Sequence, residues 1–152
     1  MDCRHEHFMR IALEQAEEAA RHGEIPVGAC IVRGEEIVAL GRNTREEEQD
    51  PLGHAEMTAI ARAAQALGRW RLDDCTLYVT LEPCPMCAGA ILNARIFRVV
   101  YGARDDKAGC LGSLCDLSAM NFPTVPYVNA GVLEEECSRQ LQTFFQGLRE
   151  RR

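Results

Sequence analysis

The sequence predicts an α/β protein with a mixed β-sheet that carries helices on both faces. Segments with helical and strand patterns alternate along the chain in the order helix, strand, strand, helix, strand, helix, strand, helix, strand, helix. Alternation of this kind is typical of a sheet that is covered by helices on both sides. The chain has 152 residues, a length that suits one core, so we expect a single domain over residues 1–152.

The first part of the chain predicts a helix, a hairpin and a loop. Apolar residues recur at helical spacing over residues 4–22, and Gly23 ends this helix. Residues 27–32 have the apolar pattern of a strand. A tight turn follows, and residues 36–40 are expected to form the returning strand of a hairpin. Only these two strands are joined tightly enough to be certainly antiparallel. Residues 41–53 are polar and are expected to form a loop.

The same patterns predict the elements of the remaining chain. We expect further helices over residues 54–67, 86–94, 113–118 and 134–148. We expect further strands over residues 76–80, 97–101 and within 125–132. The last helix is amphipathic, and its apolar side chains at helical spacing are expected to lie mostly in the core, namely Leu141, Phe144, Phe145 and Leu148.

Composition narrows the class of protein. Apolar residues make up 47% of the chain and charged residues 26%, which is ordinary for a globular protein and unlike a disordered chain, a collagen or a coiled coil. No apolar run approaches the roughly 20 residues of a membrane span, and the N-terminus lacks a signal-peptide stretch, so we expect a cytoplasmic protein with no membrane partner. The formal net charge of −6 argues against bulk nucleic-acid binding but leaves room for a local basic face.

Two short segments carry residues that are suited to metal chemistry. The first is His54-Ala55-Glu56, and the second is Pro83-Cys84-Pro85-Met86-Cys87. A Cys-x-x-Cys pair places two thiolates within reach of one Zn²⁺, and the start of a helix lowers the pKa of a thiol. Taken alone, the cysteine pair is also compatible with buried thiols, a redox pair or half of a structural zinc site.

The combination of the two segments favours an open zinc site. One histidine and two cysteines make three ligands, which leaves a fourth position for water. Glu56 follows His54 by two residues, so its carboxylate can stand beside the metal and move protons between water and a leaving group. A closed structural site needs a fourth ligand, for which Cys110 and Cys115 are candidates, but their spacing in a Gly-rich loop fits poorly.

His-x-Glu followed by Pro-Cys-x-x-Cys is the signature of zinc-dependent nucleobase deaminases. Over nearly its whole length the sequence resembles the TadA-type tRNA-specific adenosine deaminases, a branch of the cytidine deaminase-like superfamily. The resemblance implies a three-layer αβα fold with a five-stranded mixed sheet. The segments that carry it, besides the two above, are 24–29, 77–90, 102–105, 112–114 and the pair Phe144-Phe145.

The resemblance also implies a role for each motif residue. His54, Cys84 and Cys87 would hold one Zn²⁺ per subunit, and Glu56 would be the catalytic proton shuttle in the conversion of adenosine to inosine. The implied partner is a tRNA anticodon stem-loop, with the wobble adenosine of an arginine tRNA as target, and the implied assembly is a homodimer. Substrate contacts are implied for seven further residues, namely Pro26, Val27, Asn43, Leu81, Glu82, Asp105 and Phe145.

Plainer interpretations of these residues stay open. Asn43 suits a loop turn, Val27 and Leu81 suit a core, and Asp105 suits a solvated turn. The chain also departs from the family at residues 121–123, where Asn-Phe-Pro replaces a common Asn-His pair, so substrate contacts there are expected to differ.

Two other functions also stay open. A deaminase of the same fold could act on a free base or nucleoside such as guanine or cytosine, although the segment 102–114 favours tRNA. A zinc-stabilised binding module without catalysis would leave Glu56 without a role. Deamination assays on tRNA and on free bases separate these alternatives.

Overall fold

The structure is a computed structural model that describes residues 3–151. Its helices are α1 (Cys3–Arg21), α2 (Arg45–Glu48), α3 (Ala55–Leu67), α4 (Pro85–Asn93) and α5 (Glu134–Glu150), with a short 3-10 helix at Leu117–Ala119. Its strands are β1 (Gly28–Arg33), β2 (Glu36–Arg42), β3 (Thr76–Leu81), β4 (Arg98–Ala103) and β5 (Tyr127–Ala130). Within the described range, no helix is long and apolar enough to cross a membrane.

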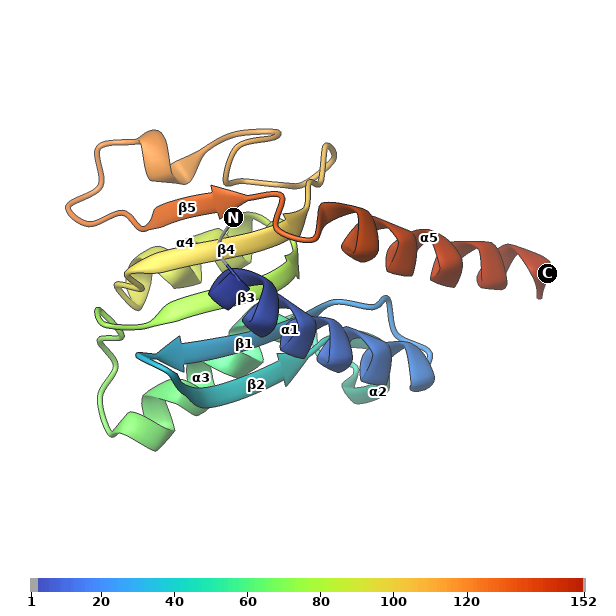
Figure 1. Cartoon of the computed structure of the whole chain (residues 1–152), viewed down its shortest axis with the longest axis horizontal. Helices are drawn as coiled ribbons and strands as arrows, with labels where there is room; N and C mark the ends of the chain where they lie inside the picture. The colour runs from blue at the N-terminus through green and yellow to red at the C-terminus, as the bar shows by residue number, and fades with distance from the viewer. Residues whose placement is uncertain (1–2, 152) are drawn as a thin grey trace.

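The strands form one mixed sheet in the order β2-β1-β3-β4-β5 (Figure 1). Strand β1 is antiparallel to both β2 and β3, which confirms the predicted hairpin. Strands β3, β4 and β5 run parallel to one another. The sequence predicted a mixed sheet, and the structure adds that its parallel part lies in the second half of the chain.

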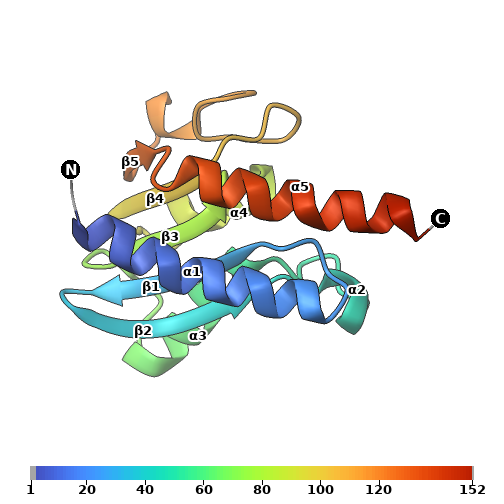
Figure 2. The same ribbon diagram turned by 45° about the vertical axis from the view of Figure 1, so that its right-hand side comes forward.

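Helices cover both faces of the sheet, as predicted. Figure 2 shows α1 and α5 on one face, while α3 and α4 lie on the other. Alternate residues of β3 contribute to the hydrophobic cores on the two faces of the sheet. Tyr78 packs with Phe8 and Met9 of α1, whereas Leu77 and Val79 pack in the core beneath α3 and α4. This period of two is the geometry of a strand that is buried on both faces.

One glycine brings α3 close to the sheet. A side-chain carbon on Gly41 in β2 would lie 2.2 Å from the backbone oxygen of Ala55 and 2.9 Å from the backbone nitrogen of Ala59, both in α3. Glycine alone fits such a close approach of two backbones. Because His54 and Glu56 flank Ala55, this contact sets the position of both residues relative to the sheet.

The predicted loop over residues 41–53 is partly wrong. Strand β2 continues to Arg42, and the short helix α2 follows within this segment. The buried carboxylate of Glu24 accepts hydrogen bonds from the backbone N–H groups of Glu46 and Glu47, at 3.1 and 2.6 Å. The cap of this helix therefore comes from a residue about twenty positions earlier, which local sequence patterns do not reveal.

Two predictions for the second half need correction. The helical stretch expected over 113–118 is a 3-10 turn at Leu117–Ala119. The apolar residues of α5 are not mainly core: Phe145 is 39% exposed, and Leu141, Phe144 and Leu148 are only half-buried. The reason is visible in Figure 1, where the outer half of α5 projects beyond the end of the sheet.

Candidate active site

Three side chains meet where α3 and α4 begin. His54 directly precedes α3, Cys84 directly precedes α4, and Cys87 lies in the first turn of α4 behind Pro85. The Nδ1 atom of His54 lies 3.6 Å from Sγ of Cys84 and 3.5 Å from Sγ of Cys87. All three ligand atoms lie within 4.8 Å of one another.

These separations fit a tetrahedral zinc ion. Zn–S bonds of about 2.3 Å and Zn–N bonds of about 2.0–2.1 Å place sulfur and nitrogen ligands roughly 3.5–3.6 Å apart at tetrahedral angles. The described residues contain one group of three metal-binding side chains, and Cys110 and Cys115 are not part of it. The ligand set therefore has the three-residue form that leaves a position open for water.

The electrostatics of the three side chains favour a thiolate. The hydrogen bond from the Cys87 thiol, aided by His54, lowers the pKa of Cys84 to about 4. The pKa of Cys87 is raised, first by its contact with Cys84 and then by burial. The start of α4 adds its partial positive charge beside both thiols. Cys84 therefore carries the charge, in the form that metals bind.

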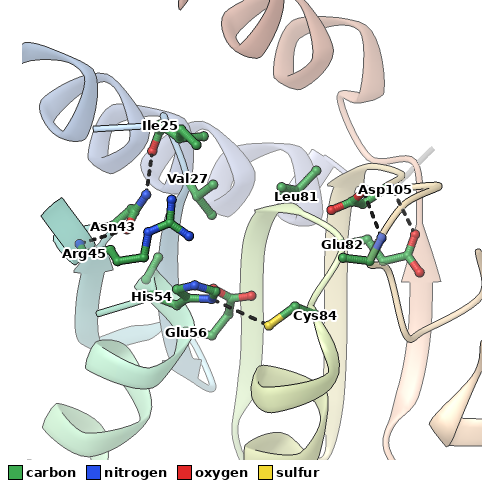
Figure 3. A pocket seen from close by; sticks show the side chains of 12 residues that line it. Ile25, Val27, Asn43, Arg45, His54, Glu56, Leu81, Glu82, Cys84 and Asp105 are labelled. Carbon is green, nitrogen blue, oxygen red and sulfur yellow. Dashed lines mark hydrogen bonds between the residues drawn. The ribbon is translucent and has the colours of Figure 1, made fainter. Parts of the chain in front are cut away.

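Glu56 lies in the first turn of α3, beside the three ligands. Its side chain is 3% exposed, and burial is the main cause that raises its pKa to about 7. A carboxyl group with a pKa near the working pH can both accept and return a proton. Figure 3 shows Glu56 next to His54 and Cys84 at the floor of a pocket.

The pocket has a volume of about 170 Å³ and opens above this floor. One wall comes from the segment before β1 and from the β2–α2 region, and the other comes from the end of β3 and the loop after β4 (Figure 3). The residues that line it are Ile25, Val27, Asn43, Arg45, His54, Ala55, Glu56, Leu81, Glu82, Cys84, Asp105 and Ala108.

Glu82 holds the second wall in place. Its buried carboxylate accepts hydrogen bonds from the backbone N–H groups of Asp105, Leu111 and Ser113 and from the Ser113 hydroxyl. Burial acts to raise the pKa of Glu82, but these hydrogen bonds outweigh it, and the pKa lies below its usual value. Gly109 makes room for this arrangement, because a side-chain carbon there would lie 2.3 Å from the carboxyl carbon.

The chain matches the family model of the MafB19-like deaminases over residues 3–149. It belongs to the MafB19-like deaminase family. This deaminase is 49% identical over 146 residues to the tRNA-specific adenosine deaminase of Bacillus subtilis strain 168, a match that covers 95% of this chain and 91% of the relative.

Solved structures support the same placement. One from a study of A-to-I editing by tRNA:A34 deaminases at the wobble position has a TM-score of 0.84 and 41% identity, and covers 88% of this chain and 98% of that chain. The guanine deaminase of Bacillus subtilis has a TM-score of 0.63 and 34% identity, and covers 99% and 95% of the two chains. The predicted resemblance to tRNA-specific adenosine deaminases and the predicted three-layer fold are thereby confirmed.

The structure brings most of the predicted residues of this deaminase into one site. The predicted residues at the pocket surface are Val27, Asn43, His54, Glu56, Leu81, Glu82, Cys84 and Asp105. Cys87 lies behind them, within reach of His54. Pro26 is buried between two lining residues, and Phe145 lies on the projecting half of α5. The structure therefore places neither Pro26 nor Phe145 at the pocket surface, and their substrate roles stay predictions.

The side chain of Asn43 is engaged in the wall of the pocket. Its Nδ2 group donates to the backbone oxygen of Ile25 at 3.1 Å, and its Oδ1 atom accepts from the backbone N–H of Arg45 at 3.1 Å. The plainer interpretation of Asn43 as a turn residue therefore holds in this structure, alongside its position at the pocket. A direct contact with substrate stays a prediction.

Besides Ala55, which lies within the predicted His54-Ala55-Glu56 segment, sequence reasoning missed three residues that line the pocket and one that supports it. Ile25, Arg45 and Ala108 line the pocket, and the buried Glu24 caps α2 beside it. Ile25 and Ala108 are apolar neighbours of predicted site residues and carried no separate signal. Arg45 was hidden because a charged residue in a polar segment usually marks a solvated loop.

Proposed function

We propose that this enzyme is a zinc-dependent tRNA adenosine deaminase that converts the wobble adenosine of an anticodon, in an arginine tRNA, to inosine. The observation that carries this proposal is the pocket floor, where a three-ligand metal set stands beside a buried carboxyl group with a pKa near 7. The substrate class is supported by the 49% identity to a tRNA-specific adenosine deaminase over nearly the whole chain.

His54, Cys84 and Cys87 would hold the zinc, one ion per subunit. When bound, zinc supplies a Lewis-acidic centre that lowers the pKa of water. Glu56 takes the proton of the water that adds to C6 of adenine and delivers it to the departing amino group. The bond between C6 and that nitrogen breaks, so one water is consumed, and inosine and ammonia are released. The apolar side chains of Val27 and Leu81 suit the two walls around a planar base.

The substrate must present an unstacked base. A deaminase takes its target out of the stack, and a base in a loop costs least to extrude. Unpaired loop bases also expose their edges to hydrogen bonding. A hairpin with an anticodon-type loop of seven nucleotides, the size that the family resemblance implies, therefore suits this pocket.

The test compares a hairpin with a duplex. Purified enzyme is offered the anticodon hairpin of an arginine tRNA, the same sequence forced into a duplex, and a hairpin with altered bases beside the target, and inosine is measured by mass spectrometry of nucleosides. We expect conversion in the first hairpin and little or none in the duplex. Equal conversion of hairpin and duplex would contradict the proposal.

A guanine deaminase is the second candidate. The 34% identity to the guanine deaminase of Bacillus subtilis, over almost the full length of both chains, favours it. This alternative predicts ammonia release from guanine and an inert hairpin. Guanine and the hairpin are therefore assayed in parallel, and activity on guanine alone would replace the first proposal with the second.

We further propose a cytoplasmic homodimer of single-domain subunits. An apolar hollow on the outer side of α3 and α4, lined by Ile60, Ala64, Trp70 and Ala90, supports a self-contact, because Trp70 is 59% exposed there. All eight cysteines are free, as suits a reducing compartment. Sedimentation velocity tests the assembly: a chain that stays monomeric at micromolar concentration refutes the dimer.

A further inference from the structure

We propose that Arg45 binds a phosphate group of the RNA strand beside the nucleotide that enters the pocket. Arg45 would thereby favour a polynucleotide substrate over a free base. This inference rests on the proposed function and extends it to a residue that the sequence did not single out. It starts from the charged and titratable side chains that line the pocket besides the Cys84 thiol, which are Arg45, His54, Glu56, Glu82 and Asp105.

Four of these five groups are already engaged within the protein. The His54 ring contacts the sulfur atoms of Cys84 and Cys87, and Glu56 is buried with its carboxyl group beside Cys87. The Glu82 carboxylate accepts four hydrogen bonds. The Asp105 carboxylate accepts from the backbone N–H groups of Lys107 and Ala108, at 3.1 and 3.2 Å. Within residues 3–151, the Arg45 guanidinium makes neither a hydrogen bond nor an ion pair. Among these five side chains, Arg45 is thus the one whose charged group has no hydrogen-bond or ion-pair partner in the described residues.

The backbone of Arg45 is fixed although its tip is free. Its N–H donates to Oδ1 of Asn43 at 3.1 Å, and its carbonyl accepts from the N–H of Asp50 at 3.0 Å. The next two N–H groups donate to the buried Glu24 carboxylate. Figure 3 shows the guanidinium turned over the pocket, on the side of Val27 and above His54. A charge held on a fixed backbone loses less freedom when it binds an anion.

The chemistry of the mouth points to phosphate. A nucleotide whose base enters the pocket keeps its backbone phosphates at the opening. The fork of an arginine guanidinium matches phosphate oxygens in pairs. The rest of α2 is acidic, being Glu46, Glu47 and Glu48, and Glu47 already pairs with Arg42 at 3.1 Å. Arg45 is therefore the α2 side chain that can attract an anion, and a free base offers it none.

The experiment measures binding and turnover separately. Binding uses a labelled hairpin that already carries inosine at the target position, so that no reaction occurs. We compare the wild type with Arg45→Gln, Arg45→Lys and the control Arg33→Gln, which removes the same charge from an exposed residue at the opposite end of β1. Zinc content and thermal midpoint are measured for each variant, and both should match the wild type because Arg45 is exposed and unpaired.

We expect Arg45→Gln to raise the Kd and the KM for the hairpin about tenfold and to leave kcat unchanged, since Arg45 contacts no reacting atom. The slope of log Kd against log salt should fall by about 0.7, the value for one phosphate of a single strand. Arg45→Lys should recover part of the affinity, and Arg33→Gln should bind as the wild type does.

Replacing single charged phosphates of the hairpin by neutral linkages identifies the phosphate that Arg45 binds. Each test hairpin carries one methylphosphonate linkage, on the 5′ or the 3′ side of the target nucleotide. One of the two hairpins should bind the wild type more weakly than the unmodified hairpin does. With that hairpin, Arg45→Gln should cause no further loss of affinity. If Arg45→Gln binds every hairpin as the wild type does, with the same salt slope, the inference fails and the proposed function stands. If the wild type neither binds nor deaminates the hairpin, both fail.

Discussion

Cys84 is the residue on which metal binding should depend most directly. Its thiol has a pKa of about 4 and lies 3.6 Å from the ring nitrogen of His54. We expect Cys84→Ser to lose bound zinc, because a neutral hydroxyl replaces a thiolate ligand poorly. Elemental analysis of purified protein measures the loss. Cys3→Ser, at an exposed cysteine away from the site, is the matched control and should keep one zinc per chain.

A substitution of Glu56 should impair catalysis without impairing metal binding. It lies beside the ligands, and its carboxyl group is buried with a pKa of about 7. Glu56→Gln should keep zinc and the fold but lose turnover by about 10²–10⁴-fold, the usual contribution of general acid–base catalysis. Single-turnover assays on the hairpin measure the loss, and Glu36→Gln at an exposed strand end serves as control. Near-normal turnover of Glu56→Gln would instead support a binding module without catalysis.

The distance between α3 and β2 is the element-scale feature that positions the site. A side chain at Gly41 would meet the backbone of Ala55 at 2.2 Å and push the first turn of α3 outward. We expect Gly41→Ala to destabilise the fold by about 1–3 kcal/mol, as overpacking usually does, and to weaken zinc binding through His54. Denaturant unfolding and zinc titration measure the two effects.

Gly89 in α4 provides the contrasting control. A side-chain carbon there would have no neighbour within 4 Å. Gly89→Ala should therefore stabilise the protein by up to about 1 kcal/mol, because alanine has the higher helix propensity. A destabilising Gly89→Ala would show that the open space around this residue is occupied by something other than solvent.

Elements with a strong local pattern could be predicted from the sequence, and elements that depend on distant contacts could not. The strand at 76–80 and the helix at 54–67 were confirmed because apolar periodicity and a terminal glycine mark them. The helix α2 was missed because its cap is Glu24, which lies in another segment. The apolar face of α5 predicted burial, but local periodicity cannot tell how far a sheet extends beneath a helix.

The same division applies to the site. The grouping of His54, Cys84 and Cys87 with Glu56 beside them could be predicted because metal chemistry demands particular residue types at fixed spacing. Arg45 could not, since its significance lies in the absence of a partner, which appears only when all the charged groups of the pocket are placed together. Substrate residues taken from the family resemblance were located at the pocket except Pro26 and Phe145.

On the scale of the whole molecule, zinc should contribute to stability. The candidate ligands come from the starts of two helices, α3 before β3 and α4 after it along the chain, so a bound metal would join segments about thirty residues apart. Zinc at a hundredfold excess over its Kd should add about 2.7 kcal/mol to the free energy of unfolding. For a chain of this size that raises the thermal midpoint by about 5–10 °C.

Calorimetry with zinc and with a chelator measures this difference. Cys84→Ser is the control, because its midpoint should not respond to the chelator. If the chelator leaves the wild-type midpoint unchanged while removing the metal, the ion contributes to catalysis without stabilising the fold.

Because one buried carboxylate holds the base of the loop after β4, the tip of that loop is separable from its support. Asp106 and Lys107 are exposed at the tip, whereas Glu82, Gly109 and Ser113 make the anchor. Libraries that randomise the tip and keep the anchor should yield folded enzymes with altered preference for the bases around the target. The site thus combines a pocket floor, where residues are held by buried contacts, with an exposed loop tip whose sequence can vary without disturbing that floor.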